Sequence, residues 1–77
     1  MPKLRQLGKD LVAESGVVRG SVFGARYRDP QGVPCGGYGF VIAGGRRTER
    51  CFPYFADAMR ALRDEINLID LAAEAQR

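Results

Sequence analysis

The sequence contains no histidine and no tryptophan, and only two of its 77 residues are cysteines. Because histidine is the commonest general acid or base in enzymes, its absence argues against most acid–base mechanisms. Two cysteines without a histidine cannot supply the four ligands of a structural zinc site, so we expect neither a metal nor another cofactor. Asp64 and Glu65 are adjacent on an expected helix and point in different directions. The residue inventory therefore predicts a protein that is not an enzyme.

The scarcity of cysteine and the lack of a long apolar run also indicate where in the cell we expect the protein. No stretch approaches the roughly 18 apolar residues that a membrane span needs, so we expect no membrane partner. We expect a cytoplasmic protein in which Cys35 and Cys51 are reduced thiols, neither of them activated by a neighbour in the sequence. A disulfide between them would require the loop before Tyr38 to curl back toward the end of the next strand.

Lysine is also scarce, because ten of the twelve basic residues are arginines. Against nine acidic residues they give a net charge of +3, which fits either simple solubility or a surface that binds an acidic partner. The length, 77 residues, predicts one small domain with a thin core and no second unit.

The centre of the expected fold is a strand over 36–43 that ends in a Gly44-Gly45 pair. Such a pair is typical of a two-residue hairpin turn with positive φ. The following residues, 46–52, then form the return strand, and 17–28 form the strand on the other flank. Between the first two strands, Asp29-Pro30-Gln31-Gly32 has turn chemistry.

Helical spacing marks both ends of the chain. Leu4, Leu7, Leu11 and Val12 favour a short N-terminal helix over 3–14. From Tyr54 to Ala75 the apolar period becomes 3.6, which predicts a long helix whose stripe covers the sheet: Phe55, Ala58, Met59, Leu62, Ile66, Ile69 and Ala73. The expected fold is α+β in the order α-β-β-β-α, with a three-stranded antiparallel meander. A second apolar strip, Leu68, Leu71 and Ala72, packs against the N-terminal helix or forms a homodimer seam.

The strand register decides which side chains share a face. A two-residue turn pairs Tyr38 with Cys51 and Ile42 with Arg47, and the Asp29 turn places Phe23 opposite Tyr38 and Arg19 opposite Ile42. One face then holds Phe23, Tyr38 and Phe40, and the opposite, smoother face receives the helix. Rings beside arginines suit single-stranded nucleic acid. The alternative is that these rings form the core beneath the helix, because a one-residue slip exchanges the faces.

Two motifs carry a resemblance. Gly37-Tyr38-Gly39-Phe40-Val41 resembles the first ribonucleoprotein motif of RNA-recognition and cold-shock domains, and Cys51-Phe52-Pro53-Tyr54-Phe55 is similar to the second cold-shock motif. Gly20-Ser21-Val22 resembles the start of the first strand in that family. The resemblance implies base stacking at five positions: Tyr38, Phe40, Phe52, Tyr54 and Phe55. The expected strands and helix are also similar to the arm-binding domains of phage integrases. The size and lack of catalytic groups resemble phage-encoded inhibitors such as anti-CRISPR proteins.

The sequence therefore predicts a cytoplasmic, non-enzymatic binding protein, monomeric or homodimeric. Its first expected partner is nucleic acid, single-stranded or duplex. The alternative is a mobile-element inhibitor that blocks a nucleic-acid-handling protein complex. In either case, eight residues are the expected contacts: Arg19, Arg26, Arg28, Tyr38, Phe40, Arg46, Arg47 and Arg50.

Overall fold

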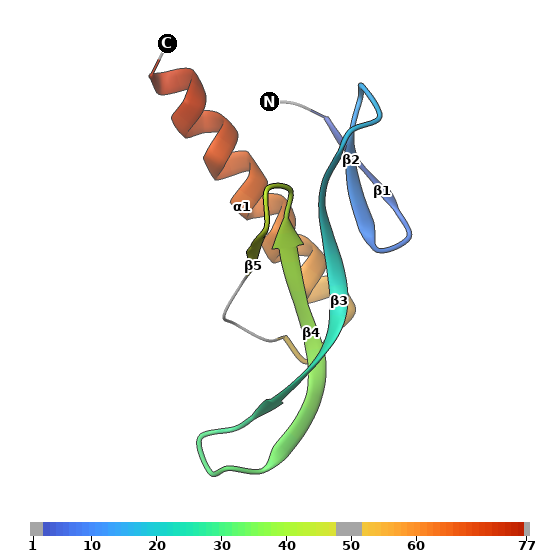
Figure 1. Ribbon diagram of the computed structural model, residues 1–77, viewed down its shortest axis with the longest axis vertical. Coiled ribbons are helices and arrows are strands. Elements are labelled where there is room, and N and C mark those ends of the chain that lie inside the picture. Colours follow the sequence, from blue (N-terminus) through green and yellow to red (C-terminus); the bar gives the residue numbers. More distant parts are fainter. Residues whose placement is uncertain (1–2, 48–51, 77) are drawn as a thin grey trace.

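A computed structural model describes residues 3–47 and 52–76, with the backbone alone at Arg46. Five strands form one antiparallel sheet in sequential order, and one helix follows (Figure 1). Four strands have four residues or more and the fifth has two. The elements are β1 (Leu4–Leu7), β2 (Asp10–Ala13), β3 (Val18–Arg28), β4 (Pro34–Ile42), β5 (Arg46–Arg47) and α1 (Phe55–Ala75). The small α+β domain with an antiparallel sheet is confirmed, but the α-β-β-β-α order and the three-stranded sheet are wrong.

The predicted N-terminal helix is instead the hairpin of β1 and β2. Gly8, with φ of 61°, takes the first of the two loop positions, where a two-residue hairpin commonly has glycine. Leu4 packs against the core and Leu11 is fully buried in it, whereas Leu7 is 50% exposed. The apolar spacing fits a helix, but a glycine with positive φ and pairing with β3 favour two short strands.

The turn between β3 and β4 forms as predicted, with one residue more in its loop. The Asp29 carboxylate accepts hydrogen bonds from the backbone N–H groups of Gln31 and Val33, each 2.9 Å long. Gly32 has φ of 82°. Because the Asp29 N–H also donates to the Val33 carbonyl, Val33 belongs to the loop and the ladder starts at the pair Arg28–Pro34.

This extra loop residue shifts the predicted register by one. Phe23 lies opposite Gly39, not Tyr38, and Ile42 lies opposite Gly20, not Arg19. The hairpin to β5 shifts as well. Gly44 and Gly45 have positive φ as predicted, but Ile42 pairs with Arg46, which leaves three loop residues instead of two. Tyr38 bridges to Phe52, and the predicted partner Cys51 lies outside the described residues.

Helix α1 covers the face of the sheet that carries Tyr38, Phe40 and Ile42 (Figure 1). Of the two arrangements that the sequence left open, the one with Tyr38 and Phe40 in the core beneath the helix is confirmed, and the smoother face, with Gly39 and Val41, does not receive the helix. The predicted helix itself is present, with Asp57 in its first turn near the positive end of the helix dipole. Its buried side chains face those of three strands, and together they make the core: Leu11, Val22, Phe40, Ile42, Ala58, Met59, Leu62 and Ile66.

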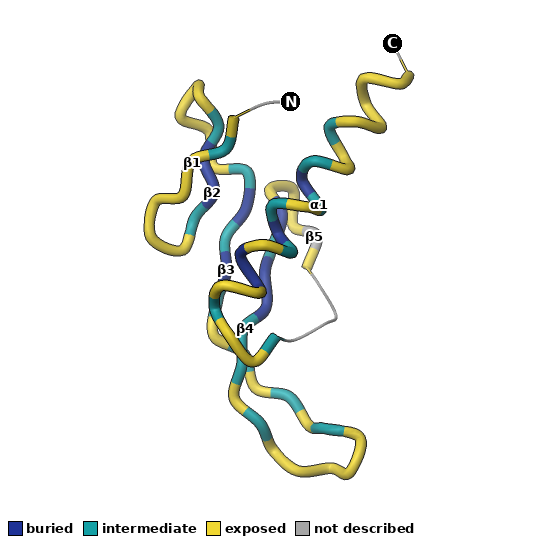
Figure 2. The backbone as a smooth tube through the Cα atoms, turned by 180° about the vertical axis from the view of Figure 1, so that it is seen from behind, coloured by how far each residue is buried: buried dark blue, intermediate teal, exposed yellow. Residues whose placement is uncertain are grey.

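The molecule is elongated, with extents of 45 × 27 × 18 Å and a radius of gyration of 13.6 Å. A compact chain of this length would have about 11–12 Å. The excess has a visible cause, since the end of the β3–β4 hairpin extends beyond the helix. We call this end, residues 24–36, the hairpin arm. Figure 2 shows the buried residues on β2, β3, β4 and the first part of α1, while the arm is intermediate or exposed.

Candidate nucleic-acid interface

The face of the sheet opposite α1 combines an aromatic ring with a cation. Cross-strand partners share a face, so Phe23, Gly39, Val41 and Arg47 lie together there. We call this side the open face. The Phe23 ring covers Gly39 so closely that a Cβ at Gly39 would lie 3.1 Å from the end of the ring. The Arg47 guanidinium carbon lies 5.3 Å from the centre of the Phe23 ring, which is cation–π range.

The other two rings of the predicted aromatic face point toward the helix. Phe40 is only 4% exposed and stacks on Phe52, with ring centres 6.3 Å apart. Tyr38 is half-buried and meets Phe55 edge to face at 5.6 Å. The structure therefore separates Phe23 from Tyr38 and Phe40. Phe40 is part of the core, where it has no face free for a nucleobase.

Arg19 is held by an acidic residue of the helix. Val12 pairs with Val18 and Leu11 with Gly20, so Arg19 is the extra residue of a β-bulge. Bulges redirect a side chain, and here the Arg19 guanidinium donates to both carboxylate oxygens of Asp70, at 2.7 and 3.3 Å. The hydrogen bond to Asp70 raises the pKa of Arg19 above its usual value. Arg19 thus ties β3 to α1 and is not available for phosphate.

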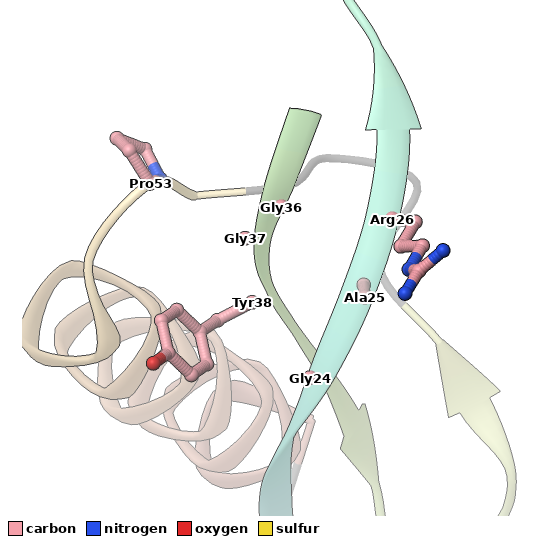
Figure 3. Close-up of a pocket in the computed structure, with 7 residues that line it drawn as sticks. All are labelled: Gly24, Ala25, Arg26, Gly36, Gly37, Tyr38 and Pro53. Atoms are coloured by element: carbon pink, nitrogen blue, oxygen red, sulfur yellow. The ribbon is translucent and has the colours of Figure 1, made fainter. Parts of the chain in front are cut away.

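On the helix side, a groove of about 490 Å³ lies at the base of the hairpin arm. It brings together two of the predicted contact residues, Tyr38 and Arg26. Figure 3 shows the Tyr38 ring and Pro53 beside the β4 edge of the paired strands and the Arg26 side chain extending beyond the β3 edge, away from the ring. The sequence predicted both Tyr38 and Arg26 as contact residues, but it did not predict that they line one groove.

The remaining predicted residues are dispersed. Arg28 is exposed near the tip of the hairpin arm, where its guanidinium donates to the Gly32 carbonyl at 2.9 Å. Arg46 is described by its backbone alone, and Arg50 lies outside the described residues. The proposed dimer seam is solvent-exposed, since Leu68 is 60% and Leu71 46% exposed and Ala72 is exposed as well. The alternative partner of that strip, an N-terminal helix, does not exist.

Residues 3–47 and 52–76 contain one cysteine and eight acidic residues. Cys35 is a free thiol, and Cys51 lies outside these ranges. Within them, no group of three or more cysteine, aspartate or glutamate side chains is placed to hold a metal ion. The single helix in the described part of the chain is not long and apolar enough to cross a membrane.

Comparison of the chain with protein-family models, with curated proteins and with solved structures found no match. We therefore infer its function from the chain's own residues.

Charge separates between the two layers. Residues 55–75, the span of α1, carry five acidic and two basic residues, which gives −3. Residues 1–54 carry nine basic and four acidic residues, which gives +5, and Arg77 adds the last positive charge. The net charge of +3 therefore understates the basic character of the sheet-forming part.

Sequence reasoning did not select Phe23, Pro53, Gly24 or Gly36 as contact residues. Phe23 was expected on one face with Tyr38 and Phe40, but the observed register places it on the other face. Glycine inside a strand is itself a signal, because it can mark a close approach by another backbone or a ligand.

Proposed function

We propose that this protein is a cytoplasmic, non-enzymatic nucleic-acid-binding protein that contacts its partner with the open face of its sheet. The observation that carries the proposal is the placement of Arg47 over Phe23 on the face that α1 does not cover. A nucleobase stacks on an aromatic ring, and a guanidinium both stacks on bases and pairs with phosphate. The two groups occur together where a strand of nucleic acid can reach them.

The glycine opposite Phe23 supports the same use. Gly39 has no side chain, so the Phe23 ring lies close against β4 and is half-buried there. A ring that is already ordered loses little conformational entropy on binding. This favours stacking over a contact that must first be organised.

The charge separation supports a polyanion as the partner. The span of α1 is negative and would repel phosphates, whereas the part of the chain that builds the sheet is positive. A nucleic acid is therefore directed to the sheet and to the hairpin arm, which bears Arg26 and Arg28.

Fluorescence anisotropy with labelled single-stranded DNA, single-stranded RNA and duplex DNA at low salt tests the proposal. Arg47→Ala removes the cation, and Phe23→Leu keeps the apolar bulk while removing the aromatic face. We expect each change to raise the Kd at least fivefold. Arg60→Ala is the matched control, because it removes the same charge from an exposed position on α1 and should stay within twofold of wild type.

Two results would contradict the proposal. One is the absence of binding by folded wild-type protein at low salt, and the other is equal affinity for wild type and both open-face variants. In the first case, the alternative of a small inhibitor acting on a nucleic-acid-handling protein complex would be examined next, with the same arginines as its contacts.

A further inference from the structure

Two glycines of the hairpin arm are not explained by the fold. The sequence has ten glycines. Five adopt positive φ, a conformation that other residues rarely take: Gly8, Gly16, Gly32, Gly44 and Gly45. At three more, a Cβ would come within 3.1 Å of a neighbouring atom: Gly20, Gly37 and Gly39. Gly24 and Gly36 have neither property.

A side chain at Gly24 or Gly36 would meet open space. In the described part of the chain, no heavy atom lies within 4 Å of a Cβ built at either position. Both residues lie inside strands, where glycine has a lower propensity than almost any other residue and weakens the sheet. The remaining explanation for these two glycines is that a ligand occupies the space, because a backbone without side chains permits its close approach.

Gly24 and Gly36 line the same groove. Its other lining residues include an aromatic ring, Tyr38, and a cation, Arg26. Gly24 pairs with Tyr38, and Gly36 pairs with Arg26, so the four residues share one face of the ribbon. The Tyr38 ring is held in place edge-on by Phe55, with an interplanar angle of 86°. Pro53 lies on the same side of β4 as the Tyr38 ring, and the cationic Arg26 side chain extends beyond β3, away from the ring (Figure 3).

These walls fit a flat ring joined to an anion. The groove volume, about 490 Å³, falls in the roughly 300–1,000 Å³ range of small-molecule sites. An aromatic wall with a glycine floor accepts a planar group, and Arg26 supplies the charge that pairs with a phosphate. In a duplex, both faces of a base are covered by its stacked neighbours, so only an unstacked base can enter.

We infer that the groove between Tyr38 and Arg26 binds one unstacked nucleotide of a single-stranded nucleic acid, with Gly24 and Gly36 as its floor. This inference rests on the proposed function, and it specifies the form of the partner. The open face and the groove lie on opposite sides of the sheet, so a bound strand passes over the edge or the end of the ribbon to reach both.

Filling the groove tests the inference. Gly24→Val and Gly36→Val place a branched side chain where the nucleotide would lie, and valine favours strands. The expected result is at least tenfold weaker binding of a short labelled oligothymidine, with unchanged affinity for a duplex probe. Ala72→Val introduces the same valine side chain, with two added carbons instead of three, at an exposed position on α1 far along the chain from the groove, and should change neither affinity. Circular dichroism and urea unfolding verify that each variant is folded.

A second measurement locates the contact in the wild-type protein. In a titration of ¹⁵N-labelled protein with the same oligothymidine, the amide signals of Gly24, Gly36 and Gly37 should shift. Binding of oligothymidine by both glycine variants within twofold of wild type would overturn the inference and leave the proposed function intact. A wild type that binds duplex alone would do the same. Absence of binding to any oligonucleotide would overturn the proposed function and, with it, this inference.

Discussion

At the scale of the residue, glycines on the paired strands β3 and β4 have opposite roles, and alanine substitution separates them. A Cβ at Gly20 would lie 2.7 Å from a methyl of Leu62 and 3.0 Å from the carbonyl oxygen of Val41. Leu62 is fully buried and cannot move aside. We expect Gly20→Ala to lower the free energy of unfolding by about 1–3 kcal/mol.

Gly36→Ala is the matched comparison, since its Cβ meets open space and its φ is not positive. It should raise the free energy of unfolding by roughly 0.5–1 kcal/mol, because alanine loses less backbone entropy than glycine. Urea unfolding of both variants measures the difference. A loss of stability in Gly36→Ala equal to that in Gly20→Ala would show that the fold itself requires glycine at both positions.

At the scale of the element, α1 contributes to stability with only part of its length. Its buried residues end at Ile66, beyond which Leu68 and Leu71 are exposed. Leu62→Ala should therefore cost about 3 kcal/mol, of the 4–12 kcal/mol that a chain of this length commonly has. Leu68→Ala removes the same atoms from a side chain that is 60% exposed and should change the unfolding free energy by less than about 0.5 kcal/mol.

Equal losses for the two leucine variants in urea unfolding would show that the end of α1 is covered in solution. That outcome would support the dimer seam predicted at Leu68, Leu71 and Ala72. Light scattering after size-exclusion chromatography would then give the oligomeric state directly.

The elements also show how far sequence reasoning extends. Helix α1 and the Asp29 turn were predictable because each has a local cause, a 3.6-residue apolar period and an Asp-Pro-x-Gly sequence. The N-terminal hairpin was not, because Leu4, Leu7 and Leu11 fit a helical stripe and only pairing with β3 reveals the strands. The register failed for a similar reason, since one hydrogen bond between Asp29 and Val33 adds a loop residue and exchanges the two faces.

The candidate site followed from the register. The residue types, arginines beside aromatic rings, were visible in the sequence, but their partners were not. No local signal pairs Arg19 with Asp70, 51 positions later in the chain, or shows that Phe40 lies beneath α1. Gly24 and Gly36 were visible in the sequence, but the open space beside them is seen only in the structure. They stand out because each of the other eight glycines has a positive φ or a close neighbour.

At the scale of the whole molecule, the separation of charge predicts the response to salt. Three of the predicted contact arginines have no acidic partner among the described residues: Arg26, Arg28 and Arg47. Each phosphate neutralised on a single strand contributes roughly −0.7 to the slope of log K against log salt concentration, so the expected slope is about −2 or steeper. Arg47→Ala should reduce its magnitude by about 0.7, whereas Arg60→Ala, on the acidic span of α1, should leave it unchanged.

The slope distinguishes electrostatic binding by the sheet from simple adhesion of a basic chain. If net charge alone drove association, Arg60→Ala and Arg47→Ala would change the slope equally, because each lowers the net charge by one. Anisotropy titrations at several salt concentrations give all three slopes with the same oligothymidine. Equal changes for the two variants would contradict a localised interface, and a change confined to Arg47→Ala would place the phosphates on the side of the molecule that α1 leaves open.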